Sequence, residues 1–134
     1  MSLSDVAAFN AAVGIQADDY GAVTTNGTGV DTLGYHQALI ILNVGTVTTS
    51  LDVKVQESSD DDTADSYADI TGAAFTQVTT ANDNAIYVAR INLTGTERYI
   101  RVVGTGVGAS QSYAVDVILT PYYTGDGATF AFEV

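Results

Sequence analysis

Short runs of alternating apolar and polar residues, separated by turn signals, constrain the fold of this chain more than any other feature. The run "LDVKVQE" at 51–57 is one example, and the same period of two recurs at 86–93 and 112–119. Side chains that alternate in this way point to opposite faces of a β-strand. The residues expected to face inward are Leu51, Val53, Val55, Tyr87, Ala89, Ile91, Leu93, Tyr113, Val115, Val117 and Leu119. Turn residues recur about every dozen positions, which predicts an all-β fold, a single antiparallel β-sandwich or a barrel.

Some strand positions that should face solvent are also apolar. The run "YHQALIILNV" at 35–44 is apolar on both faces, as expected for a central strand covered on both sides. Ile86, Val88 and Ile118 occupy outward positions of their strands. Either the second sheet or a partner subunit covers them, so we take these three residues as interface candidates.

The first 34 residues differ from the rest because they contain no basic residue and are rich in Gly, Thr and Asn. Ser4 can cap a short helix over 5–13, since Val6, Phe9 and Val13 fall roughly on one helical face. We therefore expect an N-terminal arm at 1–34, with or without this helix, and a sandwich domain at 35–134. Phe9 is an interface candidate, because a helix this short needs a surface to pack on.

Composition excludes several classes of ligand. The chain has 134 residues, enough for one domain with its own core, and it has no cysteine. Its sixteen acidic and four basic residues give a net charge of −12, which repels a phosphate backbone, so no nucleic acid partner is expected. No stretch approaches the ~18 to 20 apolar residues of a membrane span, and the N-terminus lacks the basic start of a secretory signal. We expect no membrane partner.

The most conspicuous motif is the acidic run at 60–69, which contains five aspartates. Asp60, Asp62 and Asp65 are candidate calcium ligands, because hard cations bind several carboxylate oxygens. The spacing is not that of an EF-hand, however, since Ala64 and Asp65 stand where a ligand and a glycine belong. A solvated hairpin tip is the main interpretation, and an irregular calcium site is the alternative.

No set of residues predicts catalysis. Asp52, Asp69 and Asp116 could in principle pair for glycoside hydrolysis, but each lies at an alternating polar position where solvation explains it. His36 is the single histidine, and no nucleophile elbow accompanies it. The glycines of 104–108 do not have dinucleotide-binding spacing and predict a flexible loop. We expect no enzyme activity and no cofactor.

Three of the four basic residues, Arg90, Arg98 and Arg101, lie within twelve positions of one another. An arginine on a strand of so acidic a protein is expected to pair with a carboxylate. The partners are either Glu97 and Asp116 in the same chain or acids of another subunit. We therefore add Arg98 and Arg101 to the interface candidates.

Two stretches carry a resemblance to a known family. "VKVQESSDDDTADSYADITGAAF" at 53–75, followed by "RYIRVV" at 98–103 and a final strand pair, resembles the jelly-roll-like decoration or cement proteins of tailed-bacteriophage heads. The similarity covers roughly 35–123. It implies a structural virion protein that is assembled in the host cytoplasm and binds the outer capsid surface as a homotrimer. Its partner there is the major capsid protein, whose lattice it stabilises.

A second function of a different class stays open. Similar strand patterns occur in jelly-roll carbohydrate-binding or host-adhesion modules, which stack sugars on exposed aromatic rings, in some cases with calcium. The tyrosines that could do so are Tyr20, Tyr67, Tyr122 and Tyr123. The absence of tryptophan counts against this alternative.

Overall fold

The longest strand, β4 (Tyr35–Val47), runs through the middle of one sheet in this computed structural model, which describes residues 10–121. Its alternate residues from Ala38 to Val44 are buried because they face the core. It pairs with β10 (Gln111–Pro121) on one side and β8 (Ala85–Asn92) on the other, and β1 (Asn10–Asp19) adds to β10. β4 is therefore a central strand, as its sequence predicts.

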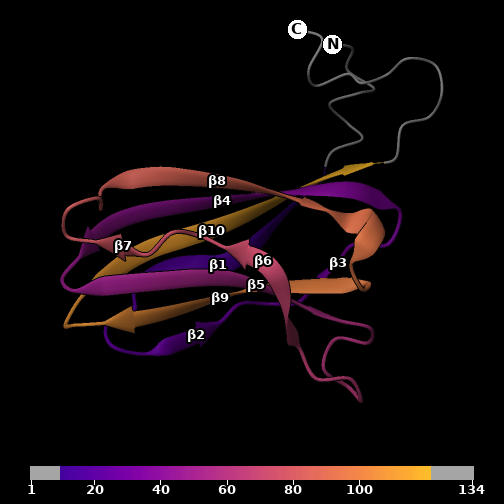
Figure 1. The fold of residues 1–134 in the computed structure, drawn as a ribbon, viewed down its shortest axis with the longest axis horizontal. Coiled ribbons are helices and arrows are strands. Elements are labelled where there is room, and N and C mark those ends of the chain that lie inside the picture. Colours follow the sequence, from indigo (N-terminus) through magenta and orange to yellow (C-terminus); the bar gives the residue numbers. More distant parts are fainter. Residues whose placement is uncertain (1–9, 122–134) are drawn as a thin grey trace, which may run out of the picture.

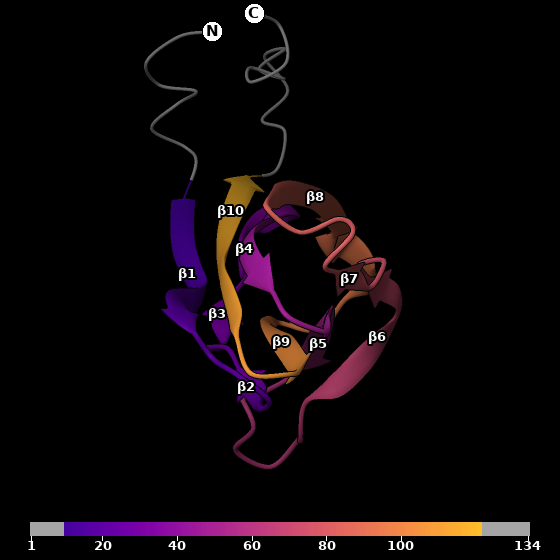
Figure 2. The same ribbon diagram turned by 90° about the vertical axis from the view of Figure 1, so that its left-hand side faces the viewer.

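A second sheet packs over the first, and the two layers are visible in Figures 1 and 2. We call the sheet β1-β10-β4-β8 sheet A and the sheet β2-β9-β5-β6 sheet B; β3 and β7 add to β9 and β5 of sheet B. The strands of sheet B are β2 (Thr24–Asn26), β3 (Val30–Asp31), β5 (Ser50–Ser58), β6 (Ala68–Ala74), β7 (Val78–Thr79) and β9 (Tyr99–Val107). In the described residues one short 3-10 helix, η1 (Leu93–Gly95), follows β8, and no helix there is long and apolar enough to cross a membrane.

Strand pairing is nested along the chain. β1 pairs with β10, β2 and β3 pair with β9, β4 pairs with β8, and β5 pairs with β6, all antiparallel. The early strands thus meet the late strands in reverse order and are divided between two packed sheets, which is jelly-roll topology. The predicted fold class, an all-β jelly-roll-like sandwich, is confirmed.

The core lies between the two sheets and follows the alternation seen in the sequence. Leu51, Val53 and Val55 of β5 are at most 2% exposed, and they face Val115 and its neighbours from β10. Tyr113 points from sheet A toward Gly104 of β9, where a Cβ atom would lie 2.2 Å from the tyrosine hydroxyl oxygen. The glycines at 104 and 106 are therefore buried strand residues that leave room for side chains of the other sheet, and the prediction of a flexible loop there is wrong.

The N-terminal segment is also different from the prediction. Residues 10–13 belong to β1 rather than to a helix, and the remainder of the expected helix, with Phe9, lies outside the described residues. Pairing with β10 from Asn10↔Leu119 onward satisfies the β1 backbone and buries Ile15, which an isolated helix could not do. Since β2 and β3 then join sheet B, residues 10–31 are an integral part of the sandwich and do not form a separate arm.

Candidate functional site

The outer face of sheet A carries a continuous group of apolar side chains. Pairing of the strands aligns Ile118 with Leu39 and places Ile41 beside Val88 on the next row. Val88 is 58% exposed and Ile86 is 63% exposed. We call this group the outer apolar patch, and its members are Val13, Leu39, Ile41, Ile86, Val88 and Ile118.

The patch explains why β4 is apolar on both faces. One face of β4 lies in the core, whereas Leu39 and Ile41 on the other face are covered by no other layer of the described chain. The outward positions predicted for Ile86, Val88 and Ile118 are correct, and Leu39, Ile41 and Val13 join them. The first two could have been found from the run at 35–44, whereas Val13 could not, because nothing local predicts that β1 lies beside β10.

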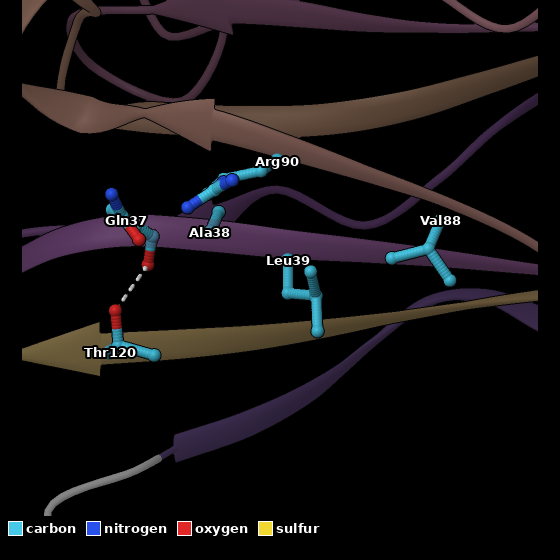
Figure 3. A pocket seen from close by; sticks show the side chains of 6 residues that line it. All are labelled: Gln37, Ala38, Leu39, Val88, Arg90 and Thr120. Atoms are coloured by element: carbon cyan, nitrogen blue, oxygen red, sulfur yellow. Dashed lines mark hydrogen bonds between the residues drawn. The ribbon is translucent and has the colours of Figure 1, made fainter. Parts of the chain in front are cut away.

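A hollow of about 500 Å³ lies at one end of this face (Figure 3). Its apolar walls come from Leu39 and Val88, and its polar rim from Gln37, Thr120 and Arg90. The Thr120 hydroxyl donates to the Gln37 carbonyl oxygen at 3.5 Å, which joins β10 to β4 at the rim. The face thus has a hollow and is mainly apolar, and the centres of protein contact surfaces are also mainly apolar.

Two opposite charges lie on the outer face among these apolar residues. Arg90 is on β8 opposite Leu39, and Asp116 is on β10 opposite Ile41. Neither side chain forms an ion pair or hydrogen bond with another of residues 10–121. In contrast, Lys54 pairs with Asp69 at 2.8 Å and Arg98 pairs with Asp31 at 2.8 Å.

Arg101, the remaining cation, is engaged on sheet B. Its Nε donates to Gln56 Oε1 at 2.9 Å, and its guanidinium lies 4.3 Å from the centre of the Tyr67 ring. The Tyr67 hydroxyl donates to Asp61 Oδ1 at 2.6 Å. Burial, and then this bond to a carboxylate, raise the pKa of Tyr67. Since Arg101 occupies one face of the ring, that face is closed to a sugar.

The other aromatic candidates for glycan stacking are placed differently. Tyr20 packs on Tyr113 with ring centres 5.0 Å apart, and its hydroxyl donates to the Gln16 carbonyl oxygen. Tyr122 and Tyr123 lie outside the described residues. The carbohydrate-binding alternative therefore depends mainly on those two residues.

The interface candidates Arg98 and Arg101 thus have partners within the chain. Arg98 binds Asp31 through two bonds, Nε to Oδ1 at 3.0 Å and a second guanidinium nitrogen to Oδ2 at 2.8 Å. These bonds lower the pKa of Asp31 and raise that of Arg98. The predicted partners Glu97 and Asp116 are not used, because β3 places Asp31 beside Tyr99 in the sheet.

Most of the acidic run forms the connection between β5 and β6, as predicted for a hairpin tip, and its last aspartate, Asp69, lies in β6. The carboxylate of Asp60 accepts backbone N–H groups of Thr63 at 3.1 Å, Ala64 at 2.8 Å and Asp65 at 3.0 Å. Asp65 in turn accepts the Ser59 N–H at 2.8 Å, which lowers the pKa of Asp65. These carboxylates hold the loop backbone in a turn, as short polar side chains do.

The three calcium candidates do not converge on a common point. In the described part of the chain, no group of three or more His, Cys, Asp or Glu side chains is arranged to hold a metal ion. Asp62 lies at the tip with a φ of 68°, and its neighbour Asp61 has a φ of 58°. Calcium binding by Asp60, Asp62 and Asp65 stays a prediction that the geometry does not favour.

The carboxylates considered for glycoside hydrolysis are dispersed. Asp52 accepts the Gln77 side-chain amide at 3.0 Å, and Asp69 is held by Lys54 at 2.8 Å, both on the outer face of sheet B. Asp116 lies on the outer face of the opposite sheet. The sandwich separates Asp116 from the other two, so these three residues form no common site.

Comparison with known proteins identifies the fold. No protein-family model and no curated protein sequence matches this chain. The crystal structure of the SPBc2 prophage-derived protein YomS is similar with a TM-score of 0.51 at 9% identity, over 83% of this chain and 91% of YomS. The PBSX exported protein XepA has a TM-score of 0.61 at 13% identity, over 85% of this chain and 38% of XepA.

A viral particle protein is also similar. The VP2 subviral particle of infectious bursal disease virus has a TM-score of 0.50 at 10% identity, and the match covers 84% of this chain and 32% of VP2. At such low identities these matches establish the shared fold alone. The chain is an antiparallel β-sandwich of the kind found in these proteins.

Proposed function

We propose that this chain is a structural protein of a tailed-bacteriophage virion, a head decoration protein that binds the outer capsid surface as a homotrimer. In this role it stabilises the lattice of the major capsid protein. The outer apolar patch is the observation that carries the proposal. Exposed, contiguous apolar side chains on a regular sheet mark a surface that contacts another protein chain, and a homotrimer needs such a surface between its copies.

The similar structures support the same class of function. One of them is a prophage-derived protein and another forms a viral particle, and both have this sandwich. The resemblance of 53–75 and 98–103 to phage decoration proteins points in the same direction. Fold alone does not determine function, so the surface of this particular chain has to carry the assignment.

The charge of the chain suits the outside of a particle. A net charge of −12 disfavours contact with packaged DNA. A trimer that engages several capsid subunits at once gains affinity through multivalency, even if each contact is weak. The proposal therefore needs only a modest contact area for each copy.

The test uses heads that lack this protein, prepared from the phage whose genome encodes it. The purified chain is added, the heads are sedimented, and their thermal stability is measured. We expect the chain to sediment with the heads and to raise their disruption temperature. Val88→Lys should weaken this effect, whereas Val107→Lys, at a residue 51% exposed at the end of β9, should not. Wild-type chain that stays in the supernatant would exclude the proposal.

A further inference from the structure

We propose that the outer apolar patch is buried by a second copy of this chain, with Arg90 of one copy paired to Asp116 of the next. This inference names the contact between copies within the proposed trimer. It concerns the free protein and makes no use of the capsid. It therefore deepens the proposed function but can hold or fail without head binding.

Arg90 lies at one edge of the patch, whereas Asp116 lies within it between Val13 and Ile41. Arg90 is on β8, at the edge of sheet A, and Asp116 is on β10, with β4 between them. Neighbouring strands are about 4.8 Å apart, so two strand spacings separate these residues by roughly 10 Å across the sheet. Their offset by one row increases this separation, which agrees with the absence of an ion pair between them among the described residues. The face therefore has a basic side and an acidic side.

The apolar residues have the same two-sided arrangement. Val88 and then Ile86 lie on successive rows to one side of Arg90 on β8, while Val13 on β1 and Ile118 on β10 are neighbours of Asp116. When the β8 side of one copy is laid on the β10–β1 side of the next, apolar side chains meet apolar side chains and the two charges meet each other. The face is thus complementary to itself in both hydrophobicity and charge.

Arg90 favours a copy of this chain as the occupant. The other three cations are already held by Asp69, Asp31 and the Gln56–Tyr67 pair. Burial of Arg90 among apolar residues without a carboxylate would be strongly unfavourable. A second copy supplies that carboxylate, Asp116, in the middle of a matching apolar surface.

The edges of the sheets are consistent with this contact. An exposed, regular and apolar edge strand is prone to association, and proteins usually protect such edges with bulges or shortness. β1 has two register shifts against β10, β6 has one against β5, and β2 has three residues. β8 pairs with β4 over eight consecutive residues without a shift and carries the exposed Ile86 and Val88. β8 is therefore the least protected of these edges, and it carries the basic side of the face.

The test is a charge exchange, read as molar mass by light scattering during size-exclusion chromatography of the purified protein. We expect wild type to have three times the mass of one chain, and Arg90→Asp and Asp116→Arg each to dissociate to the mass of one chain. The double variant, with both substitutions, should regain the wild-type mass because the pair is restored with reversed polarity. Asp52→Arg, an equal charge change on the outer face of sheet B, should leave the mass unchanged.

Circular dichroism and thermal melting establish that each variant is folded, and Val88→Lys provides a second disruption of the same surface if one charge variant is unfolded. A monomeric wild type would overturn the inference. So would single variants that stay associated, or a double variant that remains monomeric while folded. Because the measurement contains no capsid, its failure is distinguishable from a failure to bind heads.

Discussion

Gln111 is a fully buried polar residue of the described chain, and Gln111→Leu tests how the loops at one end of the sandwich are held. The side chain is 0% exposed. Its Nε2 donates to the carbonyl oxygens of Gly21 at 3.0 Å and Gly108 at 2.9 Å, and its Oε1 accepts the Thr48 N–H at 3.2 Å. It therefore joins the turn after β4, the turn after β9 and the segment between β1 and β2.

Leucine fills a similar volume but leaves the carbonyl oxygens of Gly21 and Gly108 without this partner, whereas the Thr48 N–H keeps its bond to the Ser110 carbonyl oxygen at 3.0 Å. At about 1 kcal/mol for each of these two hydrogen bonds, the free energy of unfolding should fall by about 2 kcal/mol, with a larger fall if water cannot reach the freed groups. That is a substantial part of the 5–15 kcal/mol typical of a domain. Urea unfolding followed by circular dichroism measures the change.

The matched control is Gln77→Leu, because Gln77 is exposed and its side-chain amide donates to the Asp52 carboxylate alone among the described residues. Its effect should lie within about 0.5 kcal/mol of zero. If Gln111→Leu lowers the unfolding free energy by no more than this control does, the proposed role of the buried amide is refuted.

Three further predictions concern the acidic residues and the contact between copies. Asp60→Ala should lower the unfolding free energy by about 1–2 kcal/mol equally in calcium and in EDTA, because the carboxylate caps three backbone N–H groups; a loss seen only in calcium would favour a metal site. The pKa of Glu97 is raised by its hydrogen bond to Asp65, by burial and by nearby carboxylates. At pH values above the ordinary pKa of a glutamate, ionisation of Glu97 therefore destabilises the folded state. Glu97→Gln should therefore raise the melting temperature at pH 7, and the gain should disappear as the pH falls below that ordinary pKa; an unchanged melting temperature at pH 7 would contradict this. Finally, we mix Arg90→Asp and Asp116→Arg chains in equal amounts; these chains can satisfy every contact between copies in a ring of two but not in a ring of three. For a chain that forms trimers, native mass spectrometry of the mixture should therefore show no fully restored assembly. A complete return to wild-type association would indicate a dimer.

Local alternation predicted the core-facing residues of β5, β8 and β10. Leu51, Val53 and Val55 are buried while Asp52 points outward, because a strand with one covered face must place its apolar residues on one side. The same reasoning identified Ile86, Val88 and Ile118 as outward-facing apolar residues. It also placed the acidic run at a hairpin tip, since that run separates two strands that pair.

Contacts between distant segments could not be predicted in the same way. Arg98 binds Asp31, 67 positions away, and Gln111 bonds Gly21, 90 positions away. These pairs depend on which strands are neighbours, and local periodicity contains no such information. For the same reason the helical spacing of Val6, Phe9 and Val13 was misleading for 10–13, where pairing with β10 decides the structure.

Mass spectrometry of purified virions tests the central claim most directly. Under the proposed function a tailed-phage genome encodes this chain; particles of that phage are purified by density gradient, and the copy number of the chain is measured relative to the major capsid protein with isotope-labelled peptide standards. The account predicts that the chain is present on intact particles in a fixed ratio to the major capsid protein and accessible to a protease added from outside. Its absence from the purified virions, or its protection inside them, would contradict a role on the outer surface of the head.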